Sequence, residues 1–185
     1  SEVCTGDEAL DAIVVIGYPD ADHAGDPFTA RSTSGNLSEV AAMPDNAGVS
    51  AWTALTTWTS KRQSCVSHSS TESELVSADR LMREILLPQM DLWSRMLGRE
   101  VVAILREDNQ ACIRLLRTGY SAQLRHVAKT HRVNLAFVSE CIRNNNVLME
   151  YCDTKVQKAD FLTKGLDRMK LQVALELVGL KKSKL

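Results

Sequence analysis

Acidic residues follow or begin four separate segments of this chain, and together they could support metal-dependent chemistry. Asp20 follows the apolar run "AIVVIGY", and Asp108 follows a second one, "VVAIL". Glu74 lies in the first turns of an expected long helix, and Asp160 lies at the start of a later one, in "QKADFLTK". Clustered carboxylates repel one another unless a cation neutralises them, and Mg²⁺ prefers carboxylate and water oxygens. Two such ions about 3.5–4 Å apart can bind the attacking and leaving oxygens of a phosphodiester.

Spacing alone does not select these four residues from the 23 acidic residues of the chain. The alternative is that they are solvated loop and capping acids. Asp22 and Asp26, which share the first acidic segment, are better explained as turn and capping residues than as ligands. In open α/β sheets, sites gather at strand ends and adjoining helix starts. The elements that carry the acids therefore matter as much as the acids themselves.

Strands and helices are expected to alternate along the chain, which predicts one mixed α/β sheet with helices on its faces. Pro19 should end the first strand or make it bulge, and Ser69 with Glu72 is a capping box for the long helix. Pro88 should kink or end that helix, and Asn109 should cap the next one. The expected strands are 12–18, 36–43, one or two within 49–64, 101–105 and 147–152; the expected helices are 69–86, a piece ending at Gly98, one after Asn109, 131–144, one starting near 158, and 169–180.

Composition narrows the class of protein. The chain has 185 residues, of which 44% are hydrophobic, and its net charge of −1 argues against a strongly basic nucleic-acid binder. Five scattered cysteines without a CxxC pair make a disulfide framework or a zinc site unexpected and favour a reducing, intracellular compartment. We expect no membrane span and no signal peptide. Because the sequence starts at Ser1 rather than Met, we expect a piece of a longer chain.

Four blocks of sequence add the decisive information. They read "YPDADHAGDPFTARSTSG", "WTSKRQSCVSHSSTESEL", "EDNQACI" and "KADFLTKGL". In this order they resemble the ribonuclease H domain of Ty/copia-type retrotransposon polyproteins. The resemblance covers about residues 14–166 and implies a ribonuclease H-like five-stranded mixed sheet flanked by helices. It divides the chain into an N-terminal extension (1–11), the ribonuclease H-like domain (12–166), and a C-terminal amphipathic helix with a basic tail (167–185).

The resemblance also implies an activity, namely cleavage of the RNA strand of an RNA–DNA hybrid. Carried over by position, Asp20, Glu74, Asp108 and Asp160 become the catalytic, metal-binding carboxylates, with two Mg²⁺ ions or Mn²⁺ as the cofactor. The implied partners are the hybrid and a reverse transcriptase domain of the same polyprotein, with no membrane and no zinc. The implied place of action is the cytoplasm, virus-like particles or the nucleus.

The chain departs from the family pattern at several positions. Pro19 stands where serine is usual, His23 where tryptophan is usual, and Leu75 where tyrosine is usual, and residues 39–57 are longer than the pattern. These departures keep open a degenerate module that binds nucleic acid or a protein partner without cutting. Another nuclease or an integrase-type member of the same superfamily is less compatible with the last two blocks.

Basic and polar residues near the blocks are the expected contacts to nucleic acid. Phosphates are bound by Lys and Arg and by polar side chains. We expect His126 and His131 to make surface phosphate contacts rather than to act as a general base, and the three tryptophans to lie in the core. The expected nucleic-acid contacts are Lys61, Arg62, Asn109, Gln110, Arg125 and Lys129.

Overall fold

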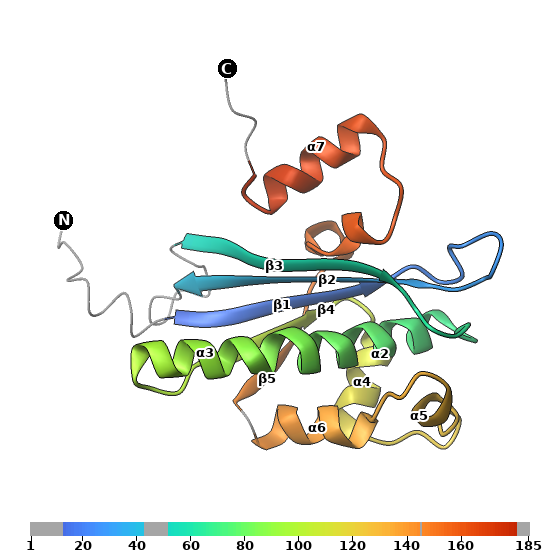
Figure 1. The fold of residues 1–185 in the computed structure, drawn as a ribbon, viewed down its shortest axis with the longest axis horizontal. Coiled ribbons are helices and arrows are strands. Elements are labelled where there is room, and N and C mark those ends of the chain that lie inside the picture. The colour runs from blue at the N-terminus through green and yellow to red at the C-terminus, as the bar shows by residue number, and fades with distance from the viewer. Residues whose placement is uncertain (1–12, 43–51, 145, 181–185) are drawn as a thin grey trace.

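A five-stranded mixed sheet organises the chain (Figure 1). The structure is a computed structural model that describes residues 13–42, 52–144 and 146–180. The strand order is β3-β2-β1-β4-β5. The strands are β1 Ile13–Ala21, β2 Thr33–Ala42, β3 Trp52–Arg62, β4 Val102–Glu107 and β5 Val147–Tyr151. The expected mixed sheet with flanking helices is therefore confirmed.

Pairing directions place the first and third sequence blocks side by side. β1 runs antiparallel to β2 and parallel to β4, and β2 runs antiparallel to β3. Because β1 and β4 are parallel, their C-terminal ends lie at the same edge of the sheet. Those ends carry Asp20 and Asp108, so the topology itself brings the two aspartates to one edge.

Helices cover both faces of the sheet, as Figure 1 shows. The lower face in this view carries the main core, in which Val15 and Leu105 of the sheet meet Leu75, Met82 and Leu116 of the helices. α7 and the 3₁₀ turn η3 lie over the other face. The helical elements are α2 Ser70–Leu81, the π-turn η1 Met82–Leu86, α3 Leu87–Leu97, α4 Gln110–Thr118, α5 Val127–Thr130, α6 Leu135–Asn144, the 3₁₀ turns η2 Thr154–Val156 and η3 Asp160–Leu162, and α7 Arg168–Leu177.

The long helix begins as predicted but does not end at Pro88. The hydroxyl of Ser69 accepts a hydrogen bond from the N–H of Glu72 at 3.1 Å, which is the expected cap. The π-turn η1 then joins α2 to α3, and Pro88 lies in the first turn of α3, where a missing N–H costs little. The helical run therefore continues to Leu97 and ends at Gly98, which has the left-handed backbone expected of a C-cap.

Pro19 is also accommodated without a break, contrary to the prediction that the strand would end or bulge there. β1 continues to Ala21, and Pro19 pairs with Asn36 of β2 in unbroken register. The carbonyl of Pro19 accepts a hydrogen bond from Nε2 of Gln157 at 2.9 Å, so it faces away from β2. The N and C=O of one strand residue face the same side of the strand. The side of Pro19 that lacks an N–H therefore faces away from β2, toward β4, whose pairing with β1 ends at Gly17.

Other expectations were wrong or only partly right. Trp52 and Trp58 lie on the edge strand β3 and are 44% and 61% exposed, so they are not core residues; Trp93 packs partly buried against the main core. The expected helix 131–144 starts only at Leu135, and the expected strand 36–43 starts earlier, at Thr33. The extension 1–11 lies outside the described residues, as does the middle of the long segment 39–57, whose ends form the β2–β3 hairpin. No helix in the described part of the chain is long and apolar enough to cross a membrane.

Candidate metal-binding active site

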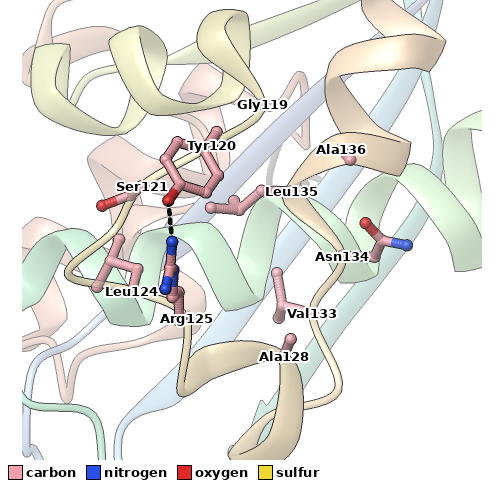
Figure 2. Close-up of a pocket in the computed structure, with 10 residues that line it drawn as sticks. All are labelled: Gly119, Tyr120, Ser121, Leu124, Arg125, Ala128, Val133, Asn134, Leu135 and Ala136. Atoms are coloured by element: carbon pink, nitrogen blue, oxygen red, sulfur yellow. Dashed lines mark hydrogen bonds between the residues drawn. The ribbon is translucent and has the colours of Figure 1, made fainter.

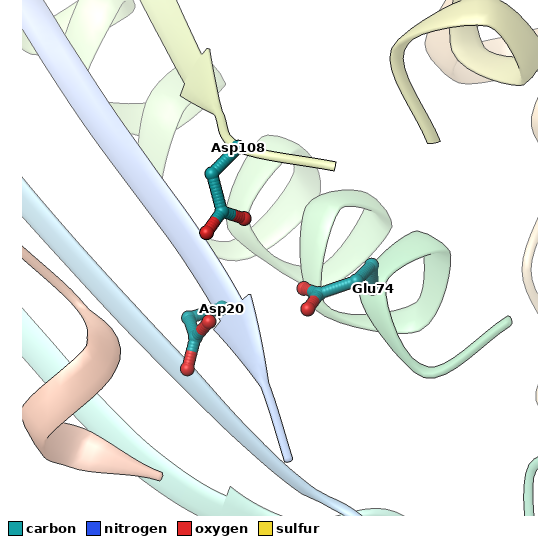
Figure 3. Close-up of side chains that lie close together, drawn as sticks. All are labelled: Asp20, Glu74 and Asp108. Atoms are coloured by element: carbon teal, nitrogen blue, oxygen red, sulfur yellow. The ribbon is translucent and has the colours of Figure 1, made fainter. Parts of the chain in front are cut away.

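Three carboxylates from distant segments converge at the edge where β1 and β4 end (Figure 3). Asp20 lies near the end of β1, Glu74 in α2 and Asp108 directly after β4, and their side chains point toward one another. One carboxylate oxygen of each lies within 4.8 Å of those of the other two. Among the described residues, no other group of three His, Cys, Asp or Glu side chains meets this spacing.

Asp20 is held in place by hydrogen bonds from both sides. Its main-chain carbonyl accepts a hydrogen bond from the Ser77 hydroxyl at 2.8 Å, and its Oδ2 accepts one from the Thr163 hydroxyl. Burial raises the pKa of Asp20 to about 6, although the Thr163 hydrogen bond and Lys164 oppose the rise. The negative charges of Asp160 and Asp108 raise this pKa further.

Glu74 is the least compensated of the three carboxylates. It is 6% exposed, and its Oε2 has no hydrogen-bond partner among the described residues. Burial raises its pKa strongly, and the charges of Glu107, Asp20 and Asp108 add to the rise. Asp108 is half-buried, and its Oδ2 accepts a hydrogen bond from the Thr154 hydroxyl at 2.8 Å. The site thus concentrates negative charge that its own side chains do not neutralise.

Asp160 lies next to this group but outside it. It begins η3, and its Oδ1 is bonded by the Nζ of Lys164. Its charge raises the pKa of Asp20, so the two carboxylates share one electrostatic environment. The structure therefore brings three of the four predicted acids into one cluster and leaves the fourth beside it, paired with a lysine.

Glu107 is a buried acid that the sequence-based prediction missed. It is fully buried behind the cluster, its Oε1 accepts the N–H of Asn109 at 3.0 Å, and its Oε2 has no partner among the described residues. Burial raises the pKa of Glu107, as do the charges of Asp108 and Asp20. The signal available in the sequence was an acid at the last position of an apolar strand, where a buried side chain is expected.

Comparison with known proteins identifies relatives of the chain and of its fold. No family model matches the chain. The chain is 27% identical over 173 residues to the retrovirus-related Pol polyprotein from transposon TNT 1-94 of Nicotiana tabacum, a match that covers 90% of this chain and 11% of that polyprotein. Ribonuclease H1 from the archaeon Halobacterium salinarum NRC-1 superposes with a TM-score of 0.50 at 12% identity, over 80% of this chain and 93% of that one. The chain has the ribonuclease H fold.

The predicted resemblance to a retrotransposon polyprotein is likewise confirmed by the tobacco relative. A second solved structure, LC11 ribonuclease H1 in complex with an RNA/DNA hybrid, matches 80% of this chain and 93% of that one at 14% identity, with a TM-score of 0.47. The ribonuclease H-like domain spans about a tenth of the tobacco polyprotein's length.

Two predicted nucleic-acid contacts of the ribonuclease H-like domain lie at the end of β3. Lys61 and Arg62 are exposed and pair with Ser34 and Thr33 of β2. Because Ser34 pairs in turn with Ala21, the residue after Asp20, both cations lie at the same end of the sheet as the acids. Arg62 also forms an ion pair with Asp26 at 3.1 Å.

Asn109 and Gln110, at the start of α4, serve different purposes. The Oδ1 of Asn109 accepts the N–H groups of Ala111 and Cys112, both at 3.0 Å, so this residue is the predicted cap of α4. Gln110 is exposed directly after it. The amide of Gln110 is therefore available to a ligand, whereas the carbonyl oxygen of Asn109 is committed to the helix.

Arg125 and Lys129 lie in a basic segment, residues 125–132, that contacts α2, the helix that carries Glu74. Figure 2 shows Arg125 on the rim of a pocket of about 230 Å³, where its guanidinium donates a hydrogen bond to the Tyr120 hydroxyl at 2.6 Å. Lys129 is exposed in α5. His126, between them, lies 3.3 Å from Glu72 of α2, measured from Nε2 to Oε2. This contact keeps the basic segment near the acidic cluster.

The role predicted for His131 was wrong. Its side chain is fully buried, and its Nε2 lies 3.2 Å from Oε1 of Glu72, although these atoms are not aligned for a hydrogen bond. A buried side chain cannot contact a phosphate on the surface. His131 instead packs against the buried carboxylate of Glu72.

The interpretation of Asp22 and Asp26 as turn residues agrees with their contacts. Oδ1 of Asp22 accepts the N–H of Thr33, and Asp26 accepts the N–H of Phe28 at 3.1 Å and the hydroxyl of Thr29. Both carboxylates are thus occupied within the β1–β2 loop.

Proposed function

We propose that this ribonuclease H-like domain is a metal-dependent endoribonuclease that cuts the RNA strand of RNA–DNA hybrids. The observation that carries the proposal is the convergence of Asp20, Glu74 and Asp108 within 4.8 Å at the end of a parallel strand pair. The likeness to a Pol polyprotein supports a role beside a reverse transcriptase in a longer chain, where the domain would remove template RNA. Such a polyprotein would act in the cytoplasm, in virus-like particles or in the nucleus.

The residues present fit a hard divalent cation. All three ligand groups are carboxylates, one of their oxygens is buried without a partner among the described residues, and burial together with mutual repulsion raises the pKa of Asp20 and Glu74. A site of this kind favours Mg²⁺ or Mn²⁺ over softer metals because its ligands are oxygen atoms. We assign Asp20, Glu74 and Asp108 as ligands, with Asp160 completing a second ion's site together with Asp20.

The domain's own residues supply orientation. When bound, two divalent ions would activate water and stabilise the leaving oxygen of a phosphodiester, which leaves a 3′-hydroxyl and a 5′-phosphate. Thr163 and Ser77 fix Asp20, and Thr154 fixes Asp108, so these carboxylates need little rearrangement to bind. Lys164, paired with Asp160, keeps a positive charge beside the phosphate position.

Cleavage assays with three duplexes test the proposal. Purified protein with Mg²⁺ should cut RNA in an RNA–DNA hybrid and leave double-stranded RNA and DNA intact, and a chelator should stop the reaction. Asp108→Asn serves as the inactive control that retains the fold. Cleavage of double-stranded DNA with the hybrid left intact would reject the substrate assignment.

A second function has one observation in its favour. Asp160 lies outside the three-carboxylate group, and its Oδ1 is engaged by Lys164. If this pairing keeps Asp160 from a metal ion, the domain would bind hybrid without cutting it. Tight hybrid binding with no cleavage in either Mg²⁺ or Mn²⁺ would favour this binding module over the nuclease.

A further inference from the structure

The loop between β1 and β2 is an ordered arm at the active-site end of the sheet. It leaves β1 one residue after Asp20 and returns at Thr33, and in Figure 1 it extends beyond the sheet on the side where β1 ends. The N–H of Asp22 donates to the Thr33 carbonyl at 3.2 Å, and the N–H of Asp26 donates to the Arg31 carbonyl at 3.2 Å. These rungs give the arm a defined shape.

Phe28 lies at the tip of this arm and is 94% exposed, the highest value among the large hydrophobic side chains of the described residues. An isolated exposed hydrophobic residue is common by itself, but several side-chain contacts hold the turn that carries Phe28. Its N–H is bonded to Oδ1 of Asp26 at 3.1 Å, the same carboxylate accepts the Thr29 hydroxyl, and Arg62 forms an ion pair with it. The ring is therefore displayed from a fixed backbone.

Cations surround the base of the arm. Arg31, Lys61 and Arg62 are all exposed, and Gln63, the next residue of that segment, donates its N–H to the Ser32 carbonyl at 2.8 Å. In the part of the chain that the structure describes, the side chains of Arg31 and Lys61 have no hydrogen-bond or ion-pair partner. An exposed aromatic ring and exposed cations on one arm suit nucleic acid, because the ring can pack on sugars while the cations bind phosphates.

We propose that the β1–β2 arm is a nucleic-acid contact in which Phe28 packs on a sugar of the substrate, away from the scissile bond. This inference rests on the proposed function, since it assumes that nucleic acid is bound at the acidic edge. In this proposal Phe28 and Arg31 bind and position the substrate, whereas the carboxylates bind the metal ions and take part in the reaction.

Chain length limits where the contact falls. Eight residues separate Asp20 from Phe28, which at about 3.3 Å per residue allows at most about 26 Å. This corresponds to about eight base steps at the roughly 3.4 Å spacing of duplex DNA. The contact should therefore fall within about eight steps of the cut, and hybrids that extend at least this far should keep it.

Binding measurements in chelator, where no cleavage occurs, test the proposal directly. Phe28→Ala should weaken binding of a 20-base-pair hybrid by about 10- to 150-fold, the range expected when a buried phenyl side chain is removed. Phe28→Trp should retain binding, and its added fluorescence relative to the parent should be quenched by the hybrid. Met96→Ala is the matched control, because Met96 is a hydrophobic residue that is 65% exposed near the C-terminal end of α3, away from the β1–β2 arm.

The outcomes separate this inference from the proposed function. Parent-like binding by Phe28→Ala, with no quenching in Phe28→Trp, would overturn the role of the arm while leaving the nuclease intact. A parent protein that binds no nucleic acid would overturn both. A Phe28→Ala defect that persists undiminished on hybrids too short to reach the arm would also reject this contact, because the defect would then be one of folding.

Discussion

The hydroxyl of Thr163 donates a hydrogen bond to Oδ2 of Asp20, 143 residues earlier in the chain. Thr163 belongs to the last sequence block and Asp20 to the first, so this bond joins the two ends of the motif series. The same hydroxyl oxygen lies 3.0 Å from the carbonyl oxygen of Asp160, so it also contacts the first residue of η3. The threonine of "ADFLTK" is therefore explained as the residue that orients the first acid.

Thr163→Val should raise the pKa of Asp20 above its value of about 6, because the hydroxyl stabilises the charged carboxylate. A hydrogen bond to a charged group contributes about 1.5–3 kcal/mol, which corresponds to about one to two pH units. NMR titration of the metal-free protein would measure the shift. Thr163→Ser keeps the donor and should titrate like the parent; equal pKa values for Val and Thr would show that the bond has no effect.

Asp108→Asn should abolish cleavage while sparing the fold and much of the hybrid affinity. Asparagine keeps the shape of the side chain but loses the charge that a divalent ion requires. The charge of Asp108 also raises the pKa of both Asp20 and Glu74, so its removal should stabilise the metal-free protein. Cleavage and metal-free melting temperature should thus change in opposite directions. Cleavage at the parent rate would remove Asp108 from the site.

Local signals predicted much of the fold. The caps at Ser69 and Asn109 and the stop at Gly98 were read correctly because capping depends on residues within one helical turn. The resemblance supplied the five-stranded mixed sheet with flanking helices. Pro88 was expected to kink or end the helix; the helical run does not end there, because the π-turn before it leads directly into α3, a feature that a residue-by-residue pattern does not show.

The candidate site was predictable only in part. Sequence blocks brought together Asp20, Glu74 and Asp108, but no local pattern indicates that His131 faces Glu72 across the fold. Such contacts depend on how distant segments pack. Trp58 was placed in the core on side-chain type alone, and its position on an edge strand overrides that preference.

Binding of hybrid should depend on salt through the predicted basic contacts. Each phosphate contact contributes about 0.9 to the slope of log K against log salt for B-form DNA. Lys61→Ala and Lys129→Ala should each reduce the slope by nearly that amount. Arg62→Ala and Arg125→Ala should reduce it less, because these side chains are shared with Asp26 and Tyr120.

Arg95→Ala is the control for the salt measurement, since Arg95 pairs with Asp91 on the exposed surface of α3. Fluorescence anisotropy in chelator from low to moderate salt would give the slopes. An unchanged slope after all four replacements would place the hybrid on another face of the domain.

Glu72→Ala should destabilise the domain and loosen the basic segment. Glu72 is 1% exposed, its carboxylate lies 3.2 Å from His131 and 3.3 Å from His126, and it accepts the N–H of His68. Removing the carboxylate leaves the N–H of His68 without its partner, and a buried donor without a partner costs about 1–3 kcal/mol. The control is Glu84→Ala, because Glu84 pairs with Arg80 on the surface at 3.6 Å and such pairs contribute about 0–1 kcal/mol.

Denaturant unfolding and amide hydrogen exchange would measure both effects of Glu72→Ala. Exchange should accelerate in α5, between Val127 and Thr130, more than in β1. Unchanged exchange in α5 would mean that the histidines do not fasten the segment to α2.

The metal-free domain should lose stability as pH rises from about 4 to 6, and Mg²⁺ should restore it. Asp20 has an ordinary pKa of 3.8 and a folded pKa of about 6, so in this window the unfolded chain releases a proton that the folded domain retains. Ionisation therefore favours unfolding as pH rises. The shift corresponds to about 3 kcal/mol above pH 6, and Glu74 acts in the same direction.

Asp20→Asn removes this titrating group together with its contribution to the raised pKa of Glu74. The stability of the variant relative to the metal-free parent should increase between pH 4 and 6 and then level off. Mg²⁺ should stabilise the parent at pH 7 because it binds the ionised cluster, and it should stabilise Asp20→Asn far less. Denaturant unfolding at several pH values, with and without Mg²⁺, gives all four curves. If the parent and Asp20→Asn show the same pH dependence of stability without metal, folding does not raise the pKa of Asp20. If Mg²⁺ also stabilises both proteins equally, Asp20 is not a metal ligand.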